Sequence, residues 1–186
     1  MRFTSFCLLL SALVPATVVA QDNPVLSRAA AEDQAARRGP GPIEHDDERL
    51  KTVLEQLAAD GVRTAQDQLN AAIVLQHSPL AVRDGRLVAV EPANYLIAHL
   101  LAKAAFAEKP EEAATLVAQT IDRYLTFTAG VQRYGTNRLI NQVTGAEELV
   151  PIDRSTTDAE RAIYGVRPLA ELLKQFPEAV RRPQNE

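Results

Sequence analysis

Apolar residues recur along most of this chain three or four positions apart, the spacing that places them on one face of an α-helix. The clearest case is a stripe of four residues, Leu50, Val53, Leu54 and Leu57. Glycine and proline interrupt this pattern and mark where one helix ends and the next begins. We therefore predict a mainly α-helical bundle of about six or seven helices, at residues 27–38, 46–59, 64–77, 92–108, 110–128, 157–164 and 168–176.

Two of the predicted helix starts carry a capping box. Thr64 precedes Asp67 by three positions, and Thr157 stands in the same relation to Glu160. In this motif the threonine hydroxyl accepts a hydrogen bond from the backbone of the acidic residue, and the carboxylate accepts one from the backbone of the threonine. These pairs therefore indicate where two of the helices begin.

Two stretches lack helical spacing. Residues 78–91 contain Pro79 and Asp84-Gly85, and we predict a loop there. Near residues 136–152, two short apolar segments flank Thr144-Gly145. That arrangement predicts a small hairpin or an irregular excursion from the helical bundle.

The first 20 residues have the features of a secretory signal peptide. Arg2 supplies a positive charge, residues 6–14 form a short apolar segment, and the small residues 18–20 precede a cleavage site before Gln21. An uncleaved anchor is the alternative, but the apolar segment is too short to span a bilayer comfortably. We expect export to the periplasm or to the medium.

The predicted division of the chain is a signal peptide at 1–20, an N-terminal helix with a Gly/Pro linker at 21–43, a helical domain at 44–176 and a flexible tail at 177–186. Cleavage would remove the only cysteine, Cys7, together with the only methionine. An exported chain without cysteine forms no disulfide bond. We therefore expect packing alone to stabilise the fold.

Charge and composition narrow the classes of partner. The chain has a net charge of −4 and no cluster of Lys and Arg on one helix face, which argues against nucleic acid as a partner. We expect no stable membrane insertion after signal cleavage, and an unknown small molecule or peptide as the partner. His45, His77 and His99 lack metal-ligand spacing and no glycine loop for phosphate is present, so we expect no metal and no cofactor. The acidic run at 44–48 fits a solvated helix start better than a calcium loop.

Three dense polar strings stand where the apolar pattern is strongest. They are Gln76-His77 at the end of one helix, Asp122-Arg123 within another, and the loop from Gln132 to Thr136. Polar groups among apolar residues need partners, and several of them drawn together are how binding sites are built. These strings therefore predict where the protein acts.

A helical wheel separates the members of the second string. The expected core stripe of that helix is Ala114, Val117, Ile121, Tyr124 and Leu125. Asp122 lies at the flank of the stripe, where its carboxylate could orient His77, whereas Arg123 lies on the far side and could clamp the following loop or an anion. The alternatives are structural: Gln76 and His77 would satisfy carbonyl groups at the helix end, and Arg123 would only tie elements together.

Taken in order, the polar strings resemble an uncharacterised family of bacterial proteins known only as a domain of unknown function. The strings that carry the resemblance are Glu32-Asp33-Gln34 with Arg37, Gln76-His77, Asp122-Arg123, Gln132-x-Tyr134-Gly135-Thr136, Pro151-Ile152-Asp153, Asp158-x-x-Arg161, Gly165 and Pro168-Leu169. The resemblance spans nearly all of the chain after residue 20 and implies a largely helical fold without an assigned activity. Family members often read Tyr-Gly-Thr-Gln, whereas this chain has Asn137 after Thr136. The resemblance also implies that the Glu32-Asp33-Gln34 helix converges with the first two strings, and that Tyr134 closes the site.

The functional hypothesis is a polar pocket for a small or peptide-like ligand, with hydrolysis as its chemistry. His77 would act as the general base and Asp122 would orient it. The predicted ligand-binding residues are Gln76, Arg123, Gln132, Tyr134, Thr136, Glu32 and Gln34. The alternative is a non-catalytic helical protein–protein interaction module of the cell envelope, and a purely structural exported protein is the third possibility.

Overall fold

The computed structural model describes residues 20–39, 44–84, 86–140, 145 and 147–176. The predicted signal peptide, except for its last residue, and the predicted tail at 177–186 lie outside the described residues. So do residues 40–43 of the predicted linker. No helix among the described residues combines the length and the apolar character that spanning a membrane requires.

The described residues form seven helices and two antiparallel sheets of two strands each, which confirms the prediction of a mainly α-helical fold. The helices are α1 (Pro24–Arg38), α2 (Asp46–Ala58), α3 (Ala65–Leu75), α4 (Pro92–Phe106), α5 (Pro110–Ala129), α6 (Asp158–Ile163) and α7 (Leu169–Gln175). The strands are β1 (Leu80–Arg83), β2 (Arg86–Ala89), β3 (Arg138–Ile140) and β4 (Glu147–Leu149).

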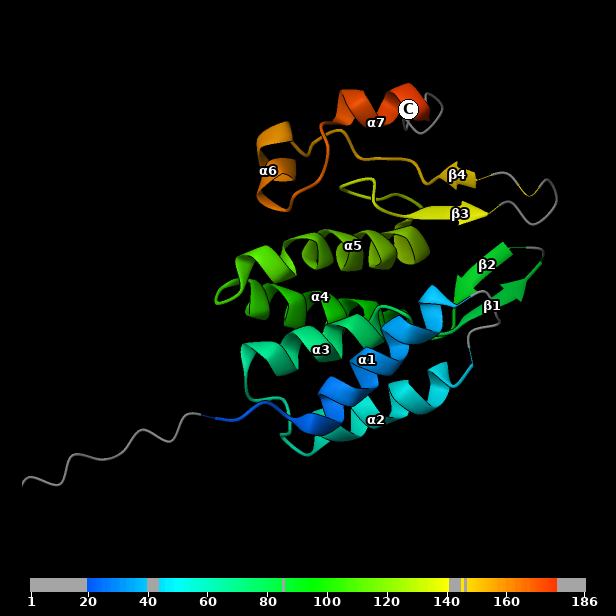
Figure 1. The fold of residues 1–186 in the computed structure, drawn as a ribbon. Helices are drawn as coiled ribbons and strands as arrows, with labels where there is room; N and C mark the ends of the chain where they lie inside the picture. Colours follow the sequence, from blue (N-terminus) through cyan, green and yellow to red (C-terminus); the bar gives the residue numbers. More distant parts are fainter. Residues whose placement is uncertain (1–19, 40–43, 85, 141–144, 146, 177–186) are drawn as a thin grey trace, which may run out of the picture.

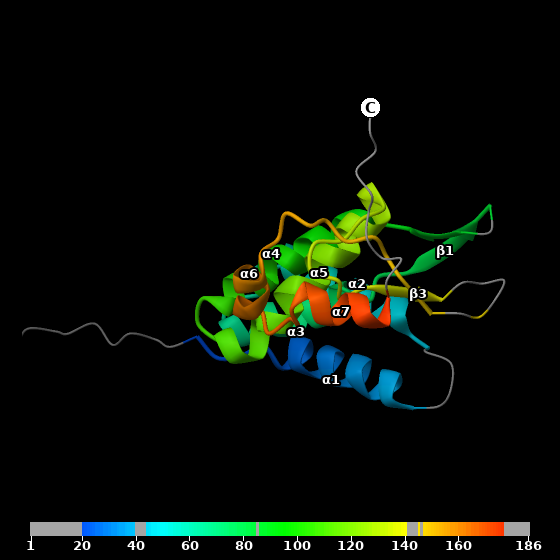
Figure 2. The same cartoon turned by 90° about the horizontal axis from the view of Figure 1, so that it is seen from above.

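The helices are arranged in layers (Figure 1). Helices α3, α4 and α5 lie side by side, and α1 and α2 pack together against α3. Helices α6 and α7 cover the opposite side of α5, together with the β3–β4 hairpin (Figure 2). Helix α5 is therefore enclosed from two sides.

Small residues allow the central helices to approach closely. Ala98, Ala102 and Ala105 of α4 are fully buried, as is Ala113 of α5. The same core includes Leu26 of α1, so the first helix belongs to the main bundle rather than to a separate unit. A smaller apolar cluster lies under α7 and consists of Leu149, Ile152 and Leu172.

Local signals placed most helix starts correctly. Both predicted capping boxes are present, at Thr64 and at Thr157. Helix α1 begins earlier than predicted, because Asn23 rather than Ser27 caps it and accepts a hydrogen bond from the N–H of Val25 at 2.9 Å. Helix α3 ends at Leu75, two residues earlier than predicted, so Gln76 and His77 form the turn that follows it.

The prediction of a loop at residues 78–91 is wrong, because these residues form the β1–β2 hairpin. Leu80 pairs with Ala89, and Asp84 adopts the left-handed conformation with φ of 50° where the chain reverses. Asp-Gly is a strong signal for such a turn. The second hairpin is confirmed in the predicted region, with Arg138 paired to Leu149. Its predicted turn at Thr144 lies outside the described residues.

The predicted core stripe of α5 is largely wrong. Of its five residues only Val117 is fully buried, and the others are half-buried. The buried face is instead formed by Ala113, Leu116, Val117, Ala118, Thr120, Asp122 and Thr126. The difference arises because α4 covers one side of the helix and the chain after Gly130 folds back over another. Asp122 is therefore buried and not at a flank.

Candidate functional site

A polar recess of about 210 Å³ lies where α1, the end of α3, α5 and the segment before β3 meet. Its lining residues are Gln34, Arg37, Gln76, His77, Gln119, Arg123, Thr136 and Asn137. The structure therefore brings together five of the predicted site residues, which are Gln34, Gln76, His77, Arg123 and Thr136. Arg37, Gln119 and Asn137 are additions that were not assigned to the site from the sequence.

His77 is held by a carboxylate from the first helix. Its Nδ1 lies 2.9 Å from Oδ2 of Asp33, whose side chain is only 1% exposed. The same oxygen accepts a hydrogen bond from Nε2 of Gln34 at 3.0 Å, and Nη1 of Arg37 lies 3.2 Å from Oδ1 in an ion pair. Oδ1 of Asp33 is buried and accepts no hydrogen bond from any described residue. Oδ2 is thus fixed by two hydrogen bonds, while Oδ1 can still accept one.

The surroundings of His77 favour its neutral form. Burial lowers the pKa of His77, and the nearby charges of Arg123 and Arg37 lower it further, while the hydrogen bond and the charge of Asp33 oppose this change. With Nδ1–H donated to Asp33, the neutral ring carries its lone pair on Nε2. This nitrogen makes no hydrogen bond with any described residue, and the side chain is 15% exposed. His77 is therefore equipped to accept a proton at the recess.

The predicted pairing of His77 with Asp122 is wrong. Asp122 is 0% exposed and lies under the loop that follows α5. Its Oδ1 accepts the backbone N–H groups of Arg133 and Tyr134 at 2.7 and 2.8 Å. Its Oδ2 accepts the N–H and the hydroxyl of Thr136, both at 2.8 Å. Both oxygens of this carboxylate are occupied by hydrogen bonds from the loop. Asp33, and not Asp122, therefore orients His77.

Burial raises the pKa of Asp122, and the four hydrogen bonds oppose that rise because they favour the charged form. All four donors point at one carboxylate, so the loop backbone is ordered around it. Gly135 lies within this loop at φ of +79°, a conformation that suits glycine. Asp122 therefore positions Thr136 at the edge of the recess.

Arg123 clamps a different element from the one predicted. Its Nη1 donates a hydrogen bond to the backbone carbonyl of Gln76, which caps the C-terminal end of α3, and not to the loop after α5. Burial lowers the pKa of Arg123. Among the residues that the structure describes, no carboxylate forms an ion pair with this guanidinium. A half-buried cation of this kind favours an anionic group in the recess.

The structure does not bring Gln132 and Tyr134, two predicted ligand-binding residues, to the recess. Gln132 is 0% exposed, and its amide accepts from the N–H of Asn137 and donates to the carbonyls of Asn137 and Val150. Tyr134 is buried, and its ring meets that of Tyr164 edge-on at 5.4 Å. Both side chains hold the loop in place rather than contact a ligand.

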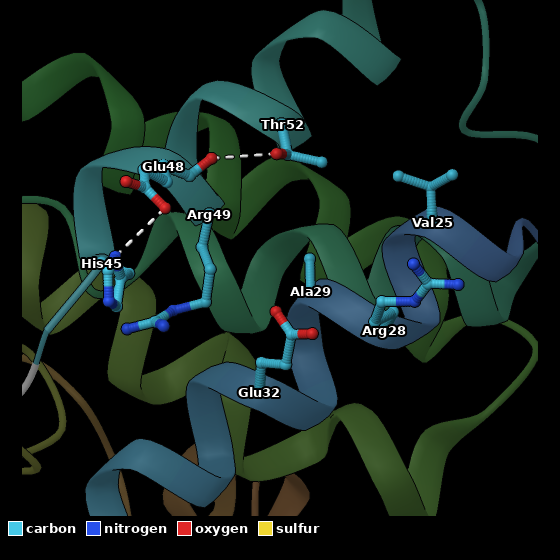
Figure 3. A pocket seen from close by; sticks show the side chains of 8 residues that line it. All are labelled: Val25, Arg28, Ala29, Glu32, His45, Glu48, Arg49 and Thr52. Carbon is cyan, nitrogen blue, oxygen red and sulfur yellow. Dashed lines mark hydrogen bonds and ion pairs between the residues drawn. The ribbon is translucent and has the colours of Figure 1, made fainter.

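Glu32, also predicted to bind ligand, lies elsewhere. It is exposed on the other side of α1, where it lines a wide cavity of about 610 Å³ between α1 and α2 (Figure 3). The full lining is Val25, Arg28, Ala29, Glu32, His45, Glu48, Arg49 and Thr52. Although this cavity is the larger one, its arginines and glutamates are balanced in number. His45, Glu48 and Glu32 are exposed, and exposed charges interact weakly. The recess at His77 is the better candidate.

A less polar groove of about 450 Å³ adjoins the recess. Arg37, His77, Arg123 and Asn137 line both, and the groove adds Ser78, Pro79, Leu80, Tyr95, Phe127, Arg138, Leu139 and Asp46. Tyr95 and Phe127 stack with ring centroids 5.7 Å apart, and the hydroxyl of Tyr95 donates to the carbonyl of Ser78 at 3.0 Å. His77 therefore lies at the junction of a polar recess and a partly apolar groove.

Asp33 was missed as the partner of His77 although the sequence contains a signal for it. Leu26, Ala29 and Ala30 form a buried stripe, and Asp33 continues that stripe at the spacing of one helix face. A buried carboxylate in such a position requires a partner. No group of metal-ligating side chains suited to a metal ion occurs within the described part of the chain.

Comparison with known proteins adds nothing to this picture: no family model, no curated protein and no solved structure matches the chain. The resemblance to an uncharacterised bacterial family therefore stays a prediction from the sequence.

Proposed function

We propose that the protein, after export to the periplasm or the medium, binds a small peptide-like ligand at the recess and hydrolyses it. The observation that carries the proposal is His77, whose Nδ1 is fixed by the buried Asp33 and whose Nε2 has no partner among the described residues. Arg123 lies beside it without a carboxylate partner in the described chain. A base and an unpaired cation lining one recess favour a ligand with a carboxylate near a reactive carbonyl.

The chemistry requires only water and the side chains of the recess. Nε2 of His77 takes a proton from a water molecule, and the hydroxide attacks the carbonyl carbon of the ligand. The resulting imidazolium is stabilised by Asp33, and the side-chain amide of Gln76 is the donor for the developing oxyanion. The proton then passes from Nε2 to the leaving group, which restores the neutral histidine.

The adjoining groove supports a ligand with an apolar portion. Tyr95, Phe127 and Leu139 lie beside the polar recess and share its central residues. Pockets of this kind bury the apolar part of a ligand and orient it with a few polar groups. The ligand would therefore place a charged end at Arg123 and a side chain in the groove.

A different observation favours the alternative, a non-catalytic interaction module of the cell envelope. The β1–β2 hairpin and the residue that follows it expose three large apolar side chains, those of Leu80, Val82 and Val90, which are 43%, 63% and 43% exposed. Exposed apolar residues that gather on one element mark contact surfaces for other proteins. In this case the recess would serve as a fixed internal structure without turnover.

Measurements of ligand binding and of hydrolysis distinguish the proposed hydrolase from the non-catalytic interaction module. The probes are N-acetyl-alanyl-alanine, which has a free carboxylate, and its C-terminal amide. Binding is measured by calorimetry. Hydrolysis is measured by the release of alanine from the acid and of alaninamide from the amide. We expect the free acid to bind about tenfold more tightly than the amide, because only the acid forms the ion pair with Arg123. Arg123→Gln should remove this preference, and His77→Gln should abolish hydrolysis while binding persists.

The matched control is His99→Gln, because His99 is a half-buried histidine at the α4–α5 interface that lines neither the recess nor the groove. It should leave binding and hydrolysis unchanged. Equal hydrolysis by the wild type and by His77→Gln would contradict the catalytic proposal. Equal affinity for the acid and the amide in the wild type, or no binding of either, would contradict the ligand site.

A further inference from the structure

A further cavity, of about 220 Å³, lies on the other side of the loop that Asp122 anchors. Its lining residues are Thr115, Gly135, Thr136, Arg138, Arg161, Gly165, Val166, Arg167 and Leu172. Three of these residues are arginines and none is acidic. The cavity is therefore positively charged and lies between α5 and the α6–α7 segment.

Arg161 of α6 is the most unusual residue of this cavity because its side chain is 0% exposed. Its Nε donates to the carbonyl of Arg167 at 2.8 Å, and its Nη2 donates to the carbonyl of Tyr134 at 2.6 Å. Its Nη1 is buried and makes no hydrogen bond with a described residue. A guanidinium fixed by two carbonyls thus retains an unused donor group.

The charge of Arg161 is only partly compensated. Its nearest carboxylate, that of Asp158, lies 3.8 Å from Nε and is exposed. Burial lowers the pKa of Arg161, which reflects the cost of holding a charge away from water. A buried cation with a free donor is stabilised when an anion occupies the space beside it.

The other two arginines add positive charge to the same cavity. Arg138 forms an ion pair with Glu147 at 3.3 Å, but both side chains are exposed, so this pair is weak and readily exchanged. Arg167 is exposed and forms no ion pair within the described chain. The guanidinium of Arg138 also lies 5.3 Å from the centre of the Phe176 ring. The cavity therefore has one buried guanidinium and two exposed ones.

We propose that this cavity binds a compact oxyanion, a phosphate or sulfate group, through Arg161, Arg138 and Arg167. Nη1 of Arg161 donates from the buried side, and Arg138 and Arg167 donate from the exposed side. Guanidinium groups match the geometry of tetrahedral oxyanions and bind them with paired hydrogen bonds. The inference rests on this cavity alone and does not depend on the proposed hydrolysis.

The position of the cavity connects it to the recess. Thr136 lines both, and its backbone and hydroxyl are fixed by Asp122 between them. An oxyanion beside Thr136 would therefore reinforce the loop that forms one edge of the recess. The two sites can be separated experimentally through Arg167, which lines the cavity but neither the recess nor the groove, whereas Arg138 lines both the cavity and the groove.

The test uses inorganic phosphate, sulfate and glycerol 3-phosphate as probes at constant ionic strength, with chloride as the reference ion. Binding is followed by calorimetry and by thermal unfolding. We expect saturable binding, and a loss of affinity of about tenfold in each of Arg167→Gln and Arg138→Gln, because each removes a charged hydrogen bond. The matched control Arg154→Gln, at an exposed arginine outside the cavity, should bind as the wild type does.

The outcomes distinguish the sites and the source of the oxyanion. Loss of phosphate binding in Arg123→Gln, with Arg167→Gln unaffected, would place the oxyanion in the recess and overturn the proposal. Absence of saturable binding in the wild type would also overturn it. Equal affinity for phosphate and sulfate supports a free ion as the ligand, whereas tighter binding of glycerol 3-phosphate supports an esterified group. Arg161→Lys is a further variant, but Arg167→Gln is decisive because that side chain is exposed and its loss leaves the fold intact.

Discussion

Nδ1 of His77 and Oδ2 of Asp33 lie 2.9 Å apart, joining the turn after α3 to the first helix. The carboxylate is almost fully buried. It also accepts a hydrogen bond from Gln34 and forms an ion pair with Arg37, and these contacts hold it against the imidazole. The pair sets the tautomer of His77 and its orientation in the recess. Its behaviour can be measured without knowledge of any ligand.

Asp33→Asn should lower the pKa of His77 further. In the wild type the hydrogen bond and the charge of Asp33 both raise that pKa against the effect of burial, and the amide has no charge to contribute. The measurement is an NMR titration of the His77 ring protons. Asp47→Asn, at an exposed residue of α2, is the control and should not change the titration. An unchanged or raised pKa in Asp33→Asn would contradict the pairing.

The stability of the protein should fall as the pH decreases through the range in which histidine titrates. Burial lowers the pKa of His77 below 6.5, so the unfolded chain takes up its proton first as the pH falls. The contribution of His77 is complete above about pH 6.5 and is lost as the pH falls through its pKa in the folded state. Urea unfolding between pH 7.5 and 5 measures this loss, and His77→Gln should make the curve flatter. A steeper curve in that variant would exclude the explanation.

Asp122→Asn should destabilise the fold by about 3 kcal/mol, because a charged acceptor of four hydrogen bonds is replaced by a group that presents its own N–H to backbone donors. Thr136→Val removes one of these bonds and should cost about 1 kcal/mol. Both values follow from urea unfolding at pH 7.5. The pKa of His77 should be the same in Asp122→Asn as in the wild type, and a large shift would restore the original assignment of Asp122.

Gly135→Ala should destabilise the protein by about 3 kcal/mol. The residue has φ of +79°, and a Cβ atom would lie 2.3 Å from Cδ2 of Leu172 and 2.9 Å from Cδ1 of Ile152. Gly130→Ala is a matched control, because its φ is +65° but nothing lies within 4 Å of its Cβ position. That change should cost only about 1 kcal/mol. Equal losses of thermal stability would show that steric contact with α7 is not the cause.

The sequence predicts the helices well because their signals are local. Capping at Thr64 and Thr157 depends on residues three positions apart, and the helices at Pro92 and Pro110 begin at their prolines. The β1–β2 hairpin was missed because each of its strands has only four residues. So few positions do not show a recognisable alternation of apolar and polar residues. The Asp84-Gly85 turn alone was the signal.

The site was harder to predict than the helices because its contacts join distant parts of the chain. A helical wheel gives the direction of Asp122 but does not show that the following loop folds back and occupies its carboxylate. The wheel of α5 therefore left His77 as an equally plausible partner. The choice of Asp33 depends on the docking of α1 against α3, which no local spacing specifies.

The carboxylate partner of His77 belongs to a helix that lies 44 residues earlier in the chain. Until α1 docks against α3, His77 is an ordinary imidazole that can adopt either tautomer, and the recess lacks Gln34 and Arg37. Chemistry at this position would therefore report that the first helix has assembled with the rest of the bundle. In a chain cut between α1 and α2, the separate pieces would lack the His77–Asp33 pair even where their helices form. The reactivity of His77 would return only when the two pieces reassociate.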